Sequence, residues 1–105
     1  MAKLSEIQNE VVRQLTRDYG GSVQDEQIRS LCLLGLGEET GEVLGLEKRR
    51  VRQNSRDSGK FTRERYVEEL GDVLWYFIGV CSNMGITLDE VWEANQEKLE
   101  ERYGV

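Results

Sequence analysis

Apolar residues recur every three or four positions along most of the chain, which is the spacing of amphipathic helices. The pattern predicts four helices, over residues 4–19, 25–53, 62–84 and 88–103. Ser5 with Gln8 fits a capping box at the start of the first helix, and Thr87 with Glu90 fits one at the start of the fourth. The polar segment 53–60 between the second and third helices is predicted to be a loop.

Composition supports an all-α fold. The chain has no proline, 8% aromatic residues and 32% charged residues, whereas strand-rich folds need more aromatic and β-branched positions. Its length favours one domain over residues 1–105. A domain of this size has only a modest core and gains stability from association. We therefore expect four helices that are completed by oligomerisation.

Charge and missing residue types exclude several functions. With a net charge of −6, the chain is a poor general binder of nucleic acid. It has no histidine, which excludes His-based zinc sites, Ser-His triads and di-iron sites built on Glu-x-x-His. A polar N-terminus and the lack of an apolar run of about 20 residues predict a cytoplasmic protein without a membrane segment. Cys32 and Cys81 lie in apolar stretches and are expected to be buried, reduced thiols.

Two helices carry acidic pairs on faces that should be apolar. The sequence EETGE occupies 38–42, and EELGD occupies 68–72. At about 100° per residue, Glu39 shares a face with Cys32 and Leu46. On the third helix, Glu69 and Asp72 likewise lie among apolar side chains. Glu39 with Glu42, and Glu69 with Asp72, have the i, i+3 spacing that places two side chains on one face of a helix.

Acidic side chains on inward faces need a nearby positive charge to remain ionised. A divalent cation would supply it, and a ligand set made only of oxygen favours Mg²⁺, with Mn²⁺ as an alternative. The competing interpretation is a solvated acidic stripe held by salt bridges to arginine. The four acids concerned are Glu39, Glu42, Glu69 and Asp72.

The two motifs resemble the EExxE…ExxD signature of the MazG-like, all-α nucleoside triphosphate pyrophosphohydrolases. The sequence EELGDVLWY at 68–76 is also typical of that family, and the resemblance extends over about residues 31–103. It implies a four-helix MazG-like bundle, Mg²⁺-dependent hydrolysis of an NTP or dNTP to the monophosphate and pyrophosphate, and a homodimer or homotetramer. The downstream residues that fit the pattern are Asn95, Lys98, Arg102 and Tyr103.

The resemblance implies roles for individual residues. The metal ligands would be Glu39, Glu42, Glu69 and Asp72. Glu38 and Glu39 would be the catalytic pair, with Glu38 in an outer position or orienting the attacking water, because it points about 100° away from Glu39. The residues expected to contact the substrate are Tyr76, as an aromatic surface for the base, and Asn95, Lys98 and Arg102, which form one stripe on the fourth helix.

Two further features leave alternatives open. Eight of the 14 lysines and arginines lie within 48–65, either as a solvated loop or as a basic flap that attracts triphosphate. They are Lys48, Arg49, Arg50, Arg52, Arg56, Lys60, Arg63 and Arg65. Gly37, Gly41 and Gly45 recur every four residues, either as incidental composition or as a site of close helix packing within the subunit or across a dimer.

Three functions are compatible with these observations. The first is an NTP pyrophosphohydrolase, with clearance of non-standard nucleotides as its role. The second is a phosphoribosyl-ATP pyrophosphohydrolase, from the same wider superfamily. The third is a non-catalytic helical interaction module whose carboxylates form salt bridges or hold a structural metal.

Overall fold

A computed structural model describes residues 3–53 and 60–104 of the chain. The described residues form four helices and no strand, so the predicted all-α class is confirmed. Each helix begins and ends within one residue of the position predicted from the sequence. The helices are α1 (Leu4–Tyr19), α2 (Glu26–Gln53), α3 (Arg63–Asn83) and α4 (Leu88–Tyr103).

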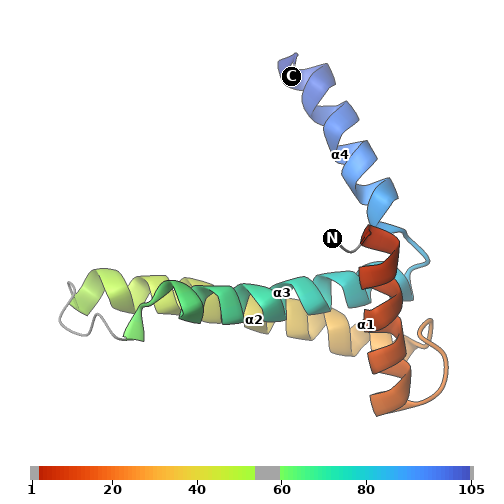
Figure 1. The fold of residues 1–105 in the computed structure, drawn as a ribbon, viewed down its shortest axis with the longest axis horizontal. Helices are drawn as coiled ribbons and strands as arrows, with labels where there is room; N and C mark the ends of the chain where they lie inside the picture. The colour runs from red at the N-terminus through yellow and green to blue at the C-terminus, as the bar shows by residue number, and fades with distance from the viewer. Residues whose placement is uncertain (1–2, 54–59, 105) are drawn as a thin grey trace.

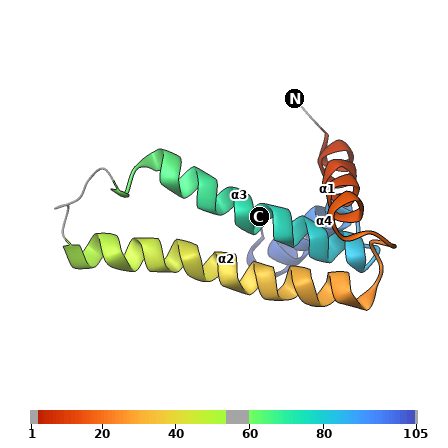
Figure 2. The same cartoon turned by 90° about the horizontal axis from the view of Figure 1, so that it is seen from below.

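The two longest helices form an antiparallel hairpin that dominates the structure. α2 and α3 lie side by side, as both Figure 1 and Figure 2 show. α1 crosses one end of this hairpin and contacts α3, whereas α4 leaves from the same end and projects away (Figure 1). In the part of the chain described, no helix is both long and apolar enough to cross a bilayer.

The core lies where α1, α2 and α3 meet. Leu15, Cys32 and Ile78 are its most completely buried side chains. Both cysteines are buried free thiols, as predicted. Gly79 allows α3 to approach α2, because a Cβ there would lie 2.6 Å from the Cys32 sulfur. This close approach fixes the distance between the two helices that carry the acidic motifs.

Gln8 connects α1 to the turn between α3 and α4, and does not cap its own helix. Its Nε2 donates to Ser82 Oγ at 3.1 Å and to the Ile86 carbonyl at 2.9 Å, while its Oε1 accepts from the Leu88 amide at 3.1 Å. The predicted capping box at Ser5 is therefore wrong: the N-cap is Lys3, with no side-chain cap. The predicted box at Thr87 and Glu90 is confirmed.

Asn83, at the end of α3, fixes the loop that precedes α2. This buried side chain donates from Nδ2 to the carbonyls of Val23 and Asp25, both at 2.9 Å. Its Oδ1 accepts from Arg29 Nε at 2.9 Å. All of its polar atoms are thus satisfied, which is what a buried amide requires.

A polar contact joins α2 and α3 near the loop end of the hairpin. The Tyr66 hydroxyl donates to Glu47 at 2.8 Å, and Arg50 pairs with the same carboxylate at 2.7 Å. Arg50 first, and then Tyr66, lower the pKa of Glu47 from 4.5 to about 2. Because this pKa is lowered on folding, the contact contributes its full stability above pH 4.5, and this contribution is lost as the pH falls toward 2.

Replacing Tyr66 with Phe is therefore expected to lower the Tm slightly at neutral pH, because Glu47 loses one donor. The difference in Tm between the variant and the wild type should shrink as the pH falls from 4.5 toward 2, where Glu47 is protonated in both proteins. Thermal unfolding followed by circular dichroism across this range measures the difference. A Tm difference that stays constant down to pH 2 would contradict this account of the contact.

One chain leaves more surface uncovered than a compact domain of its size. The radius of gyration is 16.6 Å, against about 13 Å for a compact chain of this length. The accessible surface is 7831 Å², against about 6,000 Å² for a folded monomer of this mass. The helix α3 carries an apolar stripe that is exposed in one chain. That stripe consists of Val67, Leu70, Leu74 and Phe77.

Candidate functional site

The acidic motifs of α2 and α3 meet in the middle of the hairpin. One carboxylate oxygen from each of Glu39, Glu69 and Asp72 lies within 4.8 Å of the other two. Glu39 and Glu69 are half-buried, and Asp72 is exposed. Since the helices are antiparallel neighbours, the inward positions of both motifs reach the same point from opposite sides.

Burial and neighbouring negative charges both act on Glu39 in this acidic cluster (Glu39, Glu69 and Asp72). Burial, followed by the negative charge of Asp72, raises the pKa of Glu39 above its ordinary value. Glu38, Glu69 and Glu42 raise it further. Arg65 supplies partial compensation from one side, because its guanidinium lies 3.3 Å from Glu69 Oε1.

Glu38 and Glu42 lie beside the acidic cluster but are not part of it. Both side chains are exposed, and among the described residues the group of converging oxygens includes neither. Both are close enough to Glu39 for their charges to raise its pKa. The structure thus brings together three of the four predicted ligands, while the fourth, Glu42, stands at the edge of the cluster.

The chemistry of the cluster suits a hard divalent cation. Its ligands are carboxylate oxygens, which Mg²⁺ and Mn²⁺ prefer, and at 4.8 Å or less their separations can be spanned by one ion. A cation there would also relieve the repulsion that raises the pKa of Glu39.

Tyr76 lies next to the acidic cluster on the side toward α1. Its ring packs directly on Gly35, where any Cβ would overlap it. Burial, followed by the nearby Tyr19 and Glu39, raises the pKa of its hydroxyl. Trp75 meets the Tyr76 ring edge-on at 5.1 Å between centroids and donates to Gln14 at 2.7 Å, so Trp75 is part of the packing between α1 and α3.

The three predicted substrate contacts on α4 are exposed and lie away from the acidic cluster in this chain. Asn95, Lys98 and Arg102 all lie on the helix that projects from the hairpin (Figure 1). Asn95 instead borders an apolar groove formed with Leu74, Trp92 and neighbouring side chains.

Of the alternatives left open for Gly37 and Gly41, close packing within the subunit does not occur. A Cβ at Gly37 or Gly41 would meet nothing within 4 Å, so this alternative is excluded at these positions. Gly35 and Gly79 are the positions where helices touch. The available signal was that Gly35 lies on the same face as Glu39.

The basic segment is only partly described, because Arg56 lies outside the described residues. Three of its cations line a pocket at the loop end of the hairpin: Arg49, Lys60 and Arg65. Sequence reasoning gave no indication of this pocket, since its walls come from both sides of the loop.

Comparison with known proteins agrees with the motifs. The model of the MazG nucleotide pyrophosphohydrolase domain matches residues 27–104. "Gene 37 protein" of Mycobacterium phage L5 is 29% identical over 89 residues, which cover 83% of this chain and 78% of the phage protein. No solved structure matches the chain. The family match spans both acidic motifs and most of the sequence, and the chain therefore belongs to the MazG nucleotide pyrophosphohydrolase domain family.

Proposed function

We propose that the protein is a Mg²⁺-dependent pyrophosphohydrolase that converts an NTP or dNTP and water to the corresponding monophosphate and pyrophosphate. The observation that carries this proposal is the convergence of Glu39, Glu69 and Asp72 within 4.8 Å, at motif positions of a pyrophosphohydrolase family. Three carboxylates that repel one another have little structural value, but they suit the binding of a cation that in turn binds phosphate oxygens.

Each residue has a distinct part in this proposal. Glu39, Glu69 and Asp72 hold Mg²⁺, with Mn²⁺ as a substitute, and Glu42 joins them by rotating its exposed side chain. The cation neutralises phosphate charge and lowers the pKa of water when it is bound. Glu38 orients the attacking water toward the α-phosphorus. Since the chain has no histidine, the proton of that water passes to a carboxylate.

Tyr76 is proposed to contact the base. Its ring is half-buried beside Glu39, so a base stacked on it would lie within reach of the acidic cluster. Its position on Gly35 restricts the ring to one place, which is what a stacking surface requires. This arrangement puts the nucleoside on the α1 side of the cluster.

A nucleotide panel tests the proposal. Purified protein is incubated with each NTP and dNTP, with non-standard triphosphates and with phosphoribosyl-ATP, in Mg²⁺ or in EDTA. We expect pyrophosphate and a monophosphate from at least one triphosphate, and none in EDTA. Orthophosphate alone, or no product from any compound, would refute the proposal, and turnover of phosphoribosyl-ATP alone would indicate the other activity in the superfamily. Turnover confined to non-standard triphosphates would support a clearance role.

We also propose that a second copy of this chain covers the exposed apolar stripe of α3. The stripe continues into an apolar groove bordered by Leu4, Leu88, Val91 and Trp92. The excess accessible surface of one chain is of the size that dimer formation would bury. In the resulting homodimer or homotetramer, Lys98 and Arg102 of one copy would be able to reach the acidic cluster of another copy.

Replacing Leu74 with Glu is expected to weaken this assembly, because the substitution places a charge at the centre of the stripe. We expect a shift to monomer in sedimentation velocity at micromolar concentration. The control is Glu93→Gln, because it changes the charge of an exposed residue on α4 that is not part of the stripe. A wild-type protein that is monomeric at these concentrations, or a Leu74→Glu variant that associates as the wild type does, would contradict the interface.

A further inference from the structure

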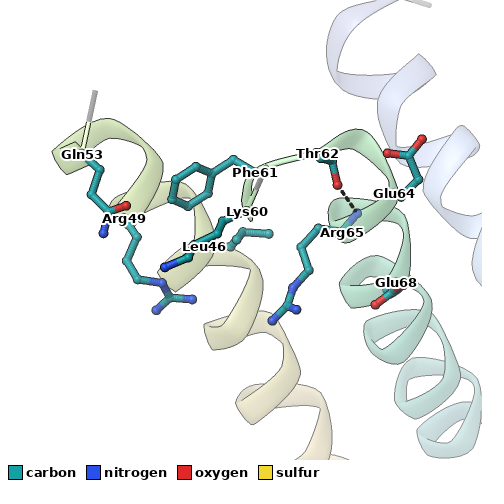
Figure 3. A pocket seen from close by; sticks show the side chains of 9 residues that line it. All are labelled: Leu46, Arg49, Gln53, Lys60, Phe61, Thr62, Glu64, Arg65 and Glu68. Carbon is teal, nitrogen blue, oxygen red and sulfur yellow. Dashed lines mark hydrogen bonds between the residues drawn. The ribbon is translucent and has the colours of Figure 1, made fainter. Parts of the chain in front are cut away.

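The pocket at the loop end of the hairpin lies between the start of α3 and the last turns of α2. Its volume is about 500 Å³, within the usual range of small-ligand sites. The nearly buried Leu46 and the half-buried Phe61 supply apolar walls. Figure 3 shows Arg49, Lys60 and Arg65 directing their nitrogen atoms into the space between the helices.

The two acids of this loop-end pocket lie on one of its walls, apart from Arg49. Glu64 and Glu68 both belong to α3, and Figure 3 shows the Glu64 carboxylate on the far side of that helix from the cations. Arg65 also pairs with Glu69 of the acidic cluster, which leaves Arg49 as the lining arginine that has no ionic partner among the described residues. A short, multiply charged anion is therefore the kind of ligand that fits it.

Arg49 has no ionic partner among the described residues. Its guanidinium folds back over Gly45, where a Cβ would lie 3.2 Å from Nη1. Gly45 precedes Arg49 by one helical turn, so the side chain runs back along α2 toward the N-terminal end of that helix. By contrast, Arg50 on the next position is paired with Glu47. Arg49 is thus free to donate to a ligand.

Arg65 connects the loop-end pocket with the acidic cluster. It lines the pocket, and its guanidinium lies 3.3 Å from Glu69. The Arg65 side chain is half exposed, whereas that of Glu69 is only 14% exposed. The cations of the pocket therefore begin where the carboxylates of the cluster end, along one continuous strip of the hairpin.

We propose that this loop-end pocket binds the pyrophosphate part of the substrate, and the pyrophosphate product after cleavage. The inference rests on the proposed function and gives the substrate a direction along the hairpin. The α-phosphate lies at the acidic cluster, the base lies toward Tyr76 and α1, and the β- and γ-phosphates lie toward the α2–α3 loop. Arg49 and Arg65 donate to the distal phosphate oxygens as the bond to the α-phosphorus breaks.

Product inhibition distinguishes the two ends of the substrate. Inhibition constants for pyrophosphate and for the nucleoside monophosphate are measured, in Mg²⁺, for the wild type and for Arg49→Gln. We expect the substitution to raise the inhibition constant of pyrophosphate about tenfold, the loss typical of one charge-assisted hydrogen bond. The inhibition constant of the monophosphate should stay unchanged.

Arg52→Gln is the matched control, because Arg52 is exposed near the same helix end but does not line the pocket. It changes the net charge equally, and pyrophosphate inhibition should stay close to that of the wild type. If both substitutions weakened pyrophosphate inhibition equally, the effect would come from the general electrostatic field of the basic segment, and the proposal would be overturned. No change in Arg49→Gln, or weaker inhibition by the monophosphate alone, would also overturn it.

The outcome is separable from that of the proposed function. If the wild type releases no pyrophosphate from any triphosphate, the function fails, and calorimetric titration of pyrophosphate with Mg²⁺ still compares the wild type with Arg49→Gln. Loss of pyrophosphate binding in the variant would keep the pocket assignment, and equal binding would refute it. If the wild type is active and Arg49→Gln keeps normal pyrophosphate inhibition, only the pocket assignment fails.

Discussion

Replacing Asp72 with Asn is expected to reduce turnover of the preferred triphosphate by at least about a hundredfold, the scale at which metal sites respond to damaged ligation. Asp72 contributes one of the three oxygens that converge within 4.8 Å, and an amide binds Mg²⁺ far less well than a carboxylate. Replacing Glu39 with Gln should have the same consequence, because Glu39 is the α2 member of the cluster. Initial rates of pyrophosphate release measure both effects.

The fold should survive these substitutions. Each one removes a negative charge from a cluster in which neighbouring carboxylates raise the pKa of Glu39, so the Tm without metal should not fall. Asp18→Asn is the matched control, since Asp18 is exposed on α1 and pairs only with Arg17 among the described side chains. Near-normal turnover in Asp72→Asn, or an equal loss in Asp18→Asn, would contradict the site.

Gly35→Ala and Gly37→Ala are expected to change stability in opposite directions although the substitutions are identical and lie in the same helix. At Gly35 the new methyl group would overlap the Tyr76 ring, and such overpacking costs about 1–3 kcal/mol. At Gly37 nothing lies within 4 Å, so the variant should gain about 1 kcal/mol from the higher helix propensity of alanine. Denaturant unfolding measures both values.

The Gly35 variant should also affect function. A displaced Tyr76 ring moves the proposed stacking surface beside Glu39, so we expect a higher KM with a smaller change in kcat. The Gly37 variant should keep the kinetics of the wild type. A Gly35→Ala variant that is more stable than the wild type would show that Tyr76 is not confined as the structure has it.

Much of this site is predictable from the sequence because helical periodicity assigns directions. It placed Glu39 on the face that carries Cys32 and Leu46, which are both buried. Together with the spacing of the two motifs, this predicted that acids of α2 and α3 would converge, as Glu39, Glu69 and Asp72 do. The capping box at Thr87 was equally clear, because it depends only on residues three apart.

Features that depend on two distant segments escaped the sequence analysis. Periodicity gives the direction of a side chain but not the helix that faces it, so the spacing of Gly37 and Gly41 did not show that no helix of the same chain packs there. The direction in which α4 leaves α3 depends on the contacts of Gln8, 74 residues before Ser82. For the same reason, the sequence did not predict the loop-end pocket, whose walls come from α2 and from the start of α3.

Isothermal titration of the protein with Mg²⁺, in the presence of a non-hydrolysable triphosphate analogue, tests the central claim most directly. The claim is that carboxylates from α2 and α3 act together as ligands of one cation centre. We predict saturable uptake by the wild type and its loss in Asp72→Asn. Absence of uptake by the wild type, with Mn²⁺ as well as with Mg²⁺, would contradict the claim and the hydrolytic function that rests on it.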